Sequence, residues 1–580
     1  MRGQTWSTTW RVWMVIAAIA AGAAVVTARL AQLQIVDHER YAMEARLIHE
    51  SEDTLSERRG ALLDRNGYPL AGSQDSFDVM VETKAWQDSI VAGESSAALS
   101  QVAGVAPEEV AATVSAAEVY EIAVARGLSY EQAQAVRELH LPGVRLIASS
   151  RRVYPEGNLG AQLLGFVGRD NAGLTGLELD LDGMLGGAKG SLTYERDGLG
   201  NQFALGERQE VEAQPGANVV LTIDRFLQRL AETELEKTID KHKALGGSVI
   251  IVQPKTGEIL AMASRPTADV TNPDLSDESK LALFRNRAIT DTYEPGSVFK
   301  LVTMACALDL GLVGPYTPWY DEGVFRVDNW GIHNWDFSRN GDQSVTQILS
   351  KSLNTGAAFL STLAGPEEFY KYVDRFGFGR PTGSSLGGEV GGQVRTPESD
   401  PANWRKVDMA TNSFGQGLSA TPLQVVMSAA TIANNGLAMK PQIVREIAYP
   451  GKSEAVPSEP GAQVIKPETA RTLREMMGVV VDGIAPALLD VDGYRVGGKT
   501  GTANLTVGSD GYKPDAYISS FVGIAPLDDP VLAVLVKIDE PQGTPWGTLV
   551  AAPAFDHIVE AALPYLKIPP TETGLVTAPQ

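Results

Sequence analysis

An uncharged apolar run near the N-terminus is the clearest pattern of hydrophobic positions in the chain. It covers the 17 residues of Val12–Ala28, between Arg11 and Arg29, and this length is at the short end of what spans a bilayer. Trp10 and Trp13 lie where an interfacial aromatic belt is expected. The pattern predicts a single transmembrane anchor at residues 12–28.

The flanking charges predict how this anchor is oriented. Arg2, Arg11 and the amino terminus are positive, so residues 1–11 are expected in the cytoplasm and the chain from residue 29 onward outside it. Two alternatives stay open. The run could be a signal peptide cleaved after Val26-Thr27-Ala28, or a buried helix of a soluble protein.

Residues 29–217 follow the anchor and are named here the pedestal. An amphipathic helix is expected at 29–50, and Asn66-Gly67 between apolar residues predicts a β-hairpin. The Ala- and Glu-rich stretch 85–140 has helical periodicity and predicts a small helical insertion. Residues 157–217 carry many glycines and few long apolar runs, which favours an elongated β-rich module.

A second domain is expected at residues 218–566. A pair of strand-like segments lies near each end of this domain. The first pair is joined by a turn at 254–257 and the second by a turn at 528–530, so two hairpins are predicted. Helical patterns lie between them, so the sequence favours a multidomain α+β fold in which an antiparallel sheet carries a helical insertion. The Pro- and Thr-containing residues 567–580 are expected to form a disordered tail.

Composition and motif searches exclude several classes of function. The 580 residues carry a net charge of −22, which argues against nucleic acid as a partner. Cys306 is the only cysteine, so no internal disulfide can form. The chain has no His-Glu-x-x-His zinc motif and no Gly-x-x-x-x-Gly-Lys-Ser/Thr phosphate loop. Its six histidines are scattered, so a Ser-His-Asp triad has no sequence support.

Ser297 and Lys300 open a long helical pattern after Pro295 and Gly296. Three residues apart, their side chains are expected on the same helix face. A serine hydroxyl attacks only when a base removes its proton, and a lysine can do so where burial and the helix dipole lower its pKa. An isolated Ser-x-x-Lys is most often a capping serine beside a solvated lysine. This one is unique in the chain and lies at a helix start, which favours a catalytic pair.

Ser352-Leu353-Asn354 forms a second short motif, in a helical segment expected at 344–360. The Ser352 hydroxyl could relay a proton, and the Asn354 amide could hold both a lysine and a substrate carbonyl. Taken alone, Ser352 is more often a helix-start serine. Another Ser-x-Asn, at 338–340, lies in a polar loop and is interpreted as a turn.

Lys499-Thr500-Gly501-Thr502 is a third motif, on a strand that leads into the C-terminal hairpin. Such a strand can offer backbone N–H groups to an extended substrate, and its lysine and hydroxyls could bind a carboxylate. Gly501 would let the substrate approach closely. A second Lys-Thr-Gly, at 255–257, precedes Ser297 and is interpreted as a hairpin turn.

With these three motifs in this order, the chain resembles the class B penicillin-binding proteins over residues 10–566. The resemblance also rests on longer stretches outside the three motifs: Arg59–Ala71, Arg152-Val153-Tyr154-Pro155, Gly176-Leu177-Glu178, Leu221-Thr222-Ile223-Asp224, Phe414-Gly415-Gln416-Gly417 and Thr421-Pro422-Leu423-Gln424. It implies a serine β-lactamase-like transpeptidase domain that follows a penicillin-binding protein dimerisation-type pedestal.

The resemblance also implies a role for each motif residue. Ser297 would be the nucleophile and Lys300 the general base, while Ser352 and Asn354 would assist proton transfer and substrate positioning. The terminal carboxylate would be bound by Lys499, Thr500 and Thr502. The backbone N–H groups of Ser297 and Thr502 would form the oxyanion hole.

The implied reaction is the cross-linking of peptidoglycan stem peptides. Ser297 would attack the D-Ala-D-Ala amide and expel D-Ala, and an amine of a neighbouring stem would resolve the ester. β-Lactams would act as inhibitors that mimic the donor, and no metal or cofactor is implied. The expected partners are a polytopic glycan polymerase and other membrane proteins of the division machinery, because no glycosyltransferase domain is found in the chain.

Several alternatives share parts of this pattern. A soluble serine β-lactamase would not need an anchor and a pedestal. A D,D-carboxypeptidase uses water as the acceptor, and a non-catalytic β-lactam sensor usually carries a cytoplasmic domain, for which residues 1–11 leave no room. An elongation-type transpeptidase is the nearest alternative to the division type, which the pedestal motifs and the compact length favour by analogy.

Overall fold

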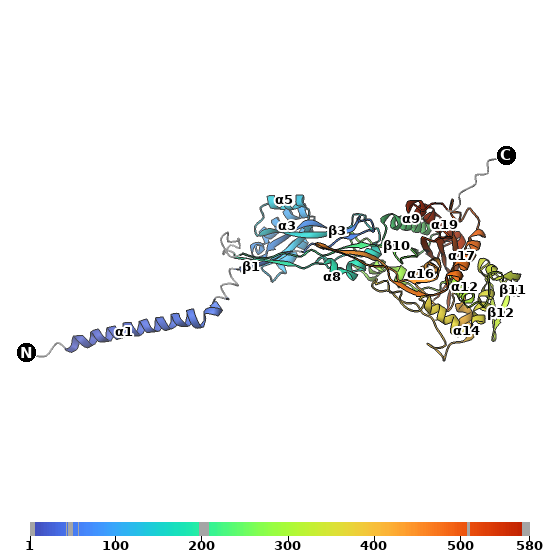
Figure 1. Ribbon diagram of the computed structural model, residues 1–580. Helices are drawn as coiled ribbons and strands as arrows, with labels where there is room; N and C mark the ends of the chain where they lie inside the picture. The colour runs from blue at the N-terminus through green and yellow to red at the C-terminus, as the bar shows by residue number, and fades with distance from the viewer. Residues whose placement is uncertain are drawn as a thin grey trace, which may run out of the picture. The chain divides into compact units, whose positions relative to one another are not determined.

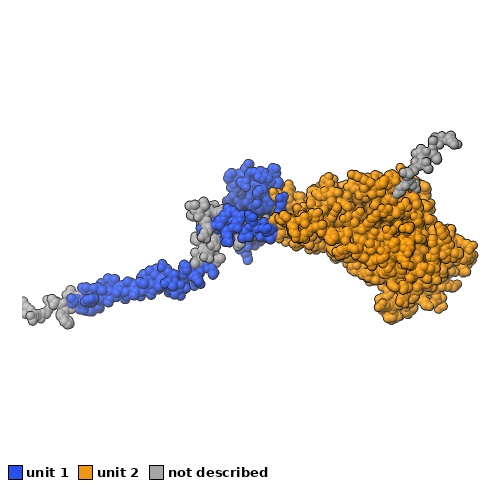
Figure 2. All heavy atoms as spheres, viewed as in Figure 1, with its two compact units in different colours: residues 1–58, 76–149, 188–214 blue, residues 59–75, 150–187, 215–580 orange. Residues whose placement is uncertain are grey.

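The computed structural model describes residues 6–41, 43, 50–55, 57–195, 208–506 and 511–570. The chain divides into two compact units, which Figure 2 colours separately. Unit 1 comprises Met1–Arg58, Ser76–Ser149 and Ala188–Gln214; unit 2 comprises Arg59–Asp75, Ser150–Gly187 and Pro215–Gln580. Three segments of the predicted pedestal, 59–75, 150–187 and 215–217, thus belong to unit 2. The domain boundaries expected from the sequence stay a prediction.

The N-terminal apolar run forms helix α1 (Trp6–Ala31), which continues as the π-helical turn η1 (Gln32–Val36). The helix from Thr9 to Val36 is long and apolar enough to cross a membrane, and its side chains are exposed. The prediction of a helix at 29–50 is wrong at its C-terminal end. The chain bends at Asp37, and Glu50 already begins strand β1 (Glu50–Leu55). Residues 42 and 44–49 lie outside the described part.

Unit 1 contains the predicted helical insertion, but a strand interrupts it. Helices α3 (Ser89–Ala103), α4 (Pro107–Ser115) and α5 (Tyr130–Glu138) are present, and β4 (Glu121–Leu128) pairs antiparallel with β3 (Pro69–Glu82). The expectation of helix throughout 85–140 is therefore corrected. The apolar residues of β4 pack with Val79 of β3 into the unit's core, so tertiary packing outweighs the local helical pattern. The other elements of this region are η2 (Thr83–Trp86), β5 (Val144–Val153), β6 (Gly190–Glu195) and β7 (Arg208–Val211).

In unit 2, a buried ion network ties together three segments that are distant in sequence. The Glu178 carboxylate accepts hydrogen bonds from Arg59 Nε and Arg152 Nε, each at 2.7 Å, and Arg59 also pairs with Asp182 at 2.6 Å. Glu178 lies in the short helix α7 (Gly176–Asp180). The β-rich expectation for 157–217 is confirmed for β6 and β7 but is wrong for residues 161–185, which form the short helices α6 (Ala161–Leu164), α7 and α8 (Asp182–Leu185).

The predicted hairpin at Asn66-Gly67 is confirmed. β2 (Leu62–Leu63) pairs antiparallel with the start of β3, and Gly67 has φ +86°, a conformation that glycine adopts without strain. β2 also runs parallel to β8 (Asn218–Leu221), and β8 pairs with β16 (Val444–Tyr449).

The centre of unit 2 is a five-stranded antiparallel sheet in the order β10-β9-β21-β20-β19. It contains both predicted hairpins: β9 (Gly246–Val252) with β10 (Ile259–Arg265), and β20 (Tyr512–Ala525) with β21 (Leu532–Asp539). The motif strand β19 (Gly497–Thr506) pairs with β20, as expected. Successive residues of β9 alternate between two cores, as a strand buried on both faces requires.

Helices cover both faces of this sheet (Figure 1). One face packs against α9 (Arg225–His242) and α19 (Ala552–Tyr565). The other packs against the helical insertion between β10 and β19, which includes α12 (Lys300–Asp309) and α16 (Pro422–Ala433). The insertion's remaining helices are α10 (Glu278–Leu281), η3 (Ala282–Phe284), α11 (Arg287–Thr290), η4 (Gly296–Phe299), α13 (Val345–Ser350), α14 (Asn354–Arg375), α15 (Lys406–Asn412) and α17 (Pro467–Asp482). Its small strands are β11 (Pro318–Asp321), β12 (Val324–Val327), β13 (Trp330–His333), β14 (Gly341–Ser344), β15 (Leu437–Met439), β17 (Lys452–Ala455) and β18 (Pro460–Gln463); α18 (Gly547–Val550) precedes α19. Most of the predicted tail, residues 571–580, lies outside the described part.

Candidate active site

Ser297 lies in the short 3₁₀ turn η4, which leads directly into α12. In a 3₁₀ turn, residues three apart lie almost directly above each other, so this geometry brings Ser297 and Lys300 together. Gly296, at φ +59°, donates its N–H to the Gly415 carbonyl at 3.0 Å. A side chain at Gly415 would overlap the Gly296 backbone, so the Phe-Gly-Gln-Gly segment fixes the nucleophile turn through a contact that only glycine permits.

The Lys300 amine is fully buried and lies at the centre of the site. Its Nζ atom is 3.0 Å from Ser297 Oγ, 2.6 Å from the Ser352 carbonyl oxygen, 3.1 Å from Ser352 Oγ and 2.8 Å from Asn354 Oδ1. Asn354 donates its Nδ2 to the His333 carbonyl at 3.2 Å, which orients its Oδ1 toward Lys300. The structure thus brings the first two predicted motifs into direct contact.

These contacts are compatible with a neutral amine. The Ser352 carbonyl and Asn354 Oδ1 are pure acceptors and can take the two N–H groups of an uncharged lysine. The single nitrogen lone pair then accepts one hydroxyl proton, from Ser297 or from Ser352. Burial, and after it the nearby positive charge of Lys499, lower the pKa of Lys300 well below its ordinary value. Such an amine can remove a proton from Ser297.

Ser352 does not lie in a helix, which corrects the expectation of a helical segment at 344–360. It occupies the turn between α13 and α14, in the left-handed conformation with φ +58°. A non-glycine residue there is strained, and such strain persists where surrounding structure enforces it. In this turn, both the carbonyl and the hydroxyl of Ser352 reach Lys300 Nζ. A helix would instead direct the carbonyl along its own axis.

The third motif lies on β19, against the nucleophile turn. A Cβ atom added to Gly501 would lie 3.0 Å from Val298 Cγ1 and 3.1 Å from the Pro295 carbonyl, so glycine allows the strand to approach this turn closely. Lys499 is buried, and its Nζ donates to the Thr500 carbonyl at 3.2 Å. Burial lowers the pKa of Lys499 to about 7. The three predicted motifs therefore meet at one place.

Two tryptophans near the site were not found by the sequence reasoning. Trp335 follows His333, the partner of Asn354, and Trp546 follows Pro545, whose carbonyl accepts the Thr502 hydroxyl at 3.4 Å. Their rings lie 4.7 Å apart and are 61% and 42% exposed, although tryptophan is usually buried. They form an apolar rim beside the second and third motifs. Only the folded chain reveals their exposure.

The decoy at 255–257 forms a hairpin turn, as expected, whereas the decoy at 338–340 lies in irregular loop structure and not in a turn. Asn340 donates its Nδ2 to Asp321 of β11 at 2.8 Å, and Ser338 donates its N–H to Asp336, so this segment makes structural contacts. Lys255 pairs with Asp529 at 2.8 Å on an exposed hairpin. Among the described residues, no cluster of three or more His, Cys, Asp or Glu side chains is arranged to hold a metal ion.

Comparison with protein families gives two matches. Residues 247–560 match the penicillin-binding protein transpeptidase domain, and residues 54–221 match the penicillin-binding protein dimerisation domain. The chain is 35% identical to Stage V sporulation protein D of Bacillus subtilis over 560 residues, covering 95% of this chain and 85% of that protein. It is 32% identical to the peptidoglycan D,D-transpeptidase FtsI of Escherichia coli over 566 residues, covering 97% and 92%.

Solved structures show the same architecture. Penicillin-binding protein 3 of Mycobacterium tuberculosis, in complex with aztreonam, aligns with a TM-score of 0.69 at 26% identity, covering 90% of this chain and 98% of that chain. A peptidoglycan synthetase of Bifidobacterium adolescentis aligns with a TM-score of 0.72 at 26% identity, with the same coverage. The likeness therefore extends over both units.

Proposed function

The chain belongs to the class B penicillin-binding proteins, and we propose that it is a peptidoglycan D,D-transpeptidase acylated on Ser297. The observation that carries the proposal is the buried Lys300 amine 3.0 Å from Ser297 Oγ. Burying a lysine costs folding free energy, and a buried lysine this close to a serine is typical of a functional site. Lys300 is thus placed as a base that can remove the proton of the nucleophile Ser297.

In the acylation step, Lys300 Nζ takes the proton of Ser297, and Oγ attacks the carbonyl carbon of the D-Ala-D-Ala bond. A C–O bond forms, and the backbone N–H groups of Ser297 and Thr502 stabilise the negative charge on the carbonyl oxygen. The C–N bond then breaks. The departing D-Ala amine receives the proton of Lys300 through the Ser352 hydroxyl, which lies 3.1 Å from Nζ.

An amine of a second stem peptide completes the reaction. It attacks the ester carbon, a C–N bond forms, and the bond to Ser297 Oγ breaks. The proton lost by the amine returns to Oγ by way of Lys300, which restores the free enzyme. A β-lactam acylates Ser297 in the same way, but its leaving amine stays tethered to the acyl group.

The donor is held by its terminal carboxylate. Lys499, Thr500 and Thr502 lie on one strand beside the nucleophile turn and supply one cation and two hydroxyls. Gly501 lets this strand pack closely against the nucleophile turn, which corrects the expectation that it admits the substrate, and Asn354 can donate to a substrate carbonyl. Because burial lowers the pKa of Lys499 to about 7, carboxylate binding near neutral pH should draw a proton onto this lysine.

The first test is labelling with fluorescent penicillin. Wild type is expected to be labelled and Ser297→Ala unlabelled, because the variant lacks the hydroxyl that the penicillin acylates, and the Ser352 hydroxyl beside Lys300 is assigned to proton relay. Ser338→Ala, in the decoy motif, is the matched control and should label as wild type does. Labelling of Ser297→Ala at the wild-type rate would refute the assignment of Ser297 as the nucleophile.

We also propose the cellular setting. Helix α1 would anchor the chain as a single pass with its N-terminus in the cytoplasm, and the catalytic unit would work outside, in septal wall synthesis. A separate polytopic glycan polymerase of the division machinery would supply the glycan strands. Depletion should then give filamentous cells, whereas rounded cells would favour the elongation branch instead.

A further inference from the structure

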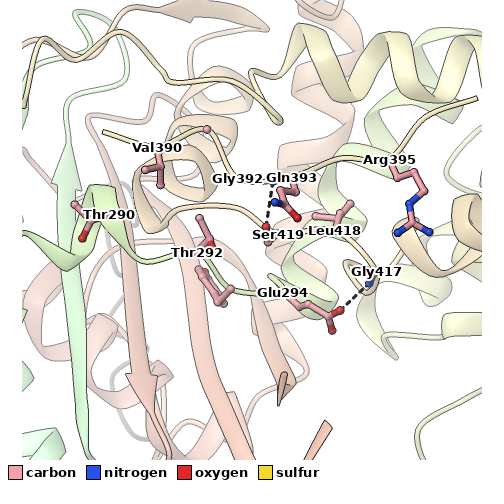
Figure 3. A pocket seen from close by; sticks show the side chains of 12 residues that line it. Thr290, Thr292, Glu294, Val390, Gly392, Gln393, Arg395, Gly417, Leu418 and Ser419 are labelled. Atoms are coloured by element: carbon pink, nitrogen blue, oxygen red, sulfur yellow. Dashed lines mark hydrogen bonds between the residues drawn. The ribbon is translucent and has the colours of Figure 1, made fainter. Parts of the chain in front are cut away.

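A polar hollow of about 640 Å³ lies beside the segment that leads to Ser297 (Figure 3). Its lining includes Glu294, Gln393, Arg395 and Ser419. Two pairs of backbone hydrogen bonds make its wall rigid, one between Tyr293 and Ala420 and one between Gln393 and Ser419. The reaction scheme above assigns no ligand to this hollow.

Glu294 is the carboxylate of the hollow, three residues before the nucleophile. Its Oε1 accepts the Gly417 N–H at 2.8 Å, the contact drawn in Figure 3, and its Oε2 accepts the Tyr512 hydroxyl at 3.2 Å. Within the described part of the chain, no lysine, arginine or histidine pairs with it. Burial raises the pKa of this carboxyl. A partly buried carboxylate without a cation is suited to bind one.

The loop that holds Glu294 also holds the nucleophile turn. Gly417 donates to Glu294, and Gly415, two residues earlier, accepts from Gly296 next to Ser297. The hollow's other charged side chain is Arg395, which is half-exposed and lies 3.5 Å from Asp400 through Nε. One acidic and one basic group thus line a polar recess whose wall includes Glu294, three residues before the reacting serine.

We propose that this hollow is the acceptor subsite, in which Glu294 holds the attacking amine of the second stem peptide and Arg395 holds one of that peptide's carboxylates. The inference rests on the proposed transpeptidase function. The donor's carboxylate is assigned to Lys499 on β19, whereas the carboxylate of this hollow, Glu294, is assigned to the acceptor's amine. Charge therefore separates the two substrates.

The chemistry at Glu294 is that of a positioning residue. An ammonium entering the hollow pairs with the carboxylate. The ammonium loses one proton to solvent, and the resulting neutral amine donates an N–H to the same oxygen, so that its lone pair is free for the ester carbon on Ser297; the second proton, lost after the C–N bond forms, is the one that returns to Oγ through Lys300. Holding the amine in this geometry raises its effective concentration over that of water, which favours transfer over hydrolysis.

The test uses the full-length protein in detergent with a D-Ala-type thioester donor. Acceptors are a stem tetrapeptide with a free side-chain amine, glycinamide, which has the amine but no carboxylate, and hydroxylamine, which is uncharged near neutral pH. The readout is the ratio of aminolysis to hydrolysis of the same acyl-enzyme, so a change in acylation rate cancels. Labelling with fluorescent penicillin is followed in parallel.

Glu294→Gln keeps one oxygen to accept the Gly417 N–H but removes the charge. It should raise the half-saturating concentration of tetrapeptide and of glycinamide about tenfold, as expected for a lost charge-assisted contact, and leave hydroxylamine unaffected. Arg395→Gln should raise the half-saturating concentration of the tetrapeptide and leave that of the other two acceptors unchanged, because only the tetrapeptide has a carboxylate. Glu367→Gln and Arg471→Gln, both on exposed helix surface, are the matched controls and should change nothing.

Unchanged aminolysis by the tetrapeptide in both variants would overturn the subsite. An equal drop in aminolysis with all three acceptors would also overturn it, because recognition by charge predicts that uncharged hydroxylamine is unaffected. If Glu294→Gln loses its fold, the exposed Arg395→Gln still decides. Failure of the proposed function has a different signature: wild type would then not be acylated by donor or penicillin at Ser297, whatever the acceptor.

Discussion

Replacement of Lys499 by methionine should make the free enzyme more stable while it weakens donor binding. The folded chain holds this amine in a dry site, where its pKa is about 7, while an unfolded chain exposes it at its ordinary 10.5. At about 1.4 kcal/mol per pKa unit, this shift costs folding on the order of 5 kcal/mol at low pH. Methionine has a similar shape and no charge to desolvate.

The contribution of Lys499 to the free energy of unfolding changes with pH in a direction that follows from its two pKa values. Above pH 10.5 the lysine is neutral in both states and costs nothing. Between pH 10.5 and 7 the unfolded chain binds one more proton than the folded chain, so wild-type stability falls as the pH falls. Below pH 7 the full cost is present. The stability difference between Lys499→Met and wild type should therefore grow from pH 10 to pH 7 and then level off.

The measurement is thermal or denaturant unfolding of both proteins at matched pH values, without ligand. Using the difference cancels the titration of every shared group. The rate of penicillin acylation is measured on the same samples and should be lower in the variant, since the carboxylate loses its cation. A stability difference that stays constant from pH 7 to pH 10 would refute the claim that burial shifts this lysine.

Two further substitutions test the packing on which the site depends. Gly501→Ala adds a methyl group against the nucleophile turn and the buried Ser520 hydroxyl, so it should cost about 1–3 kcal/mol and slow penicillin labelling; unfolding curves and labelling rates equal to wild type would contradict the tight contact. Glu178→Gln removes the countercharge that Arg59 and Arg152 share and leaves Arg59 with Asp182 alone, so it should cost about 3–5 kcal/mol in unfolding measurements; a cost below 1 kcal/mol would mean that water reaches this network.

The local elements of the site could be read from the sequence because their signals are local. The Ser-x-x-Lys spacing places two side chains together within one turn of helix, whatever surrounds them. The Asn66-Gly67 hairpin and the strands of the central sheet follow from turn chemistry and apolar runs, and the structure confirms them. The three short motifs in order, with the longer stretches, were enough to indicate the family.

Other features could not be read because they depend on residues far away in the chain. Strand β4 lies inside a stretch with helical periodicity, and its pairing with β3 decides its conformation. Ser352 has φ +58° because the turn between two helices directs its carbonyl and hydroxyl at Lys300. Neither the helical pattern around it nor its own side chain predicts this conformation.

The sequence alone determined which groups could carry the chemistry: Ser297, Lys300, and the serine, asparagine and lysine of two other motifs. Only the tertiary structure decided their chemical state. Lys300 and Lys499 are strongly basic until the fold removes them from water, and Glu294 is an ordinary carboxylate until loop 415–417 and Tyr512 enclose it. Burial and distance are properties of the packed chain, and they set the pKa values on which the reaction depends.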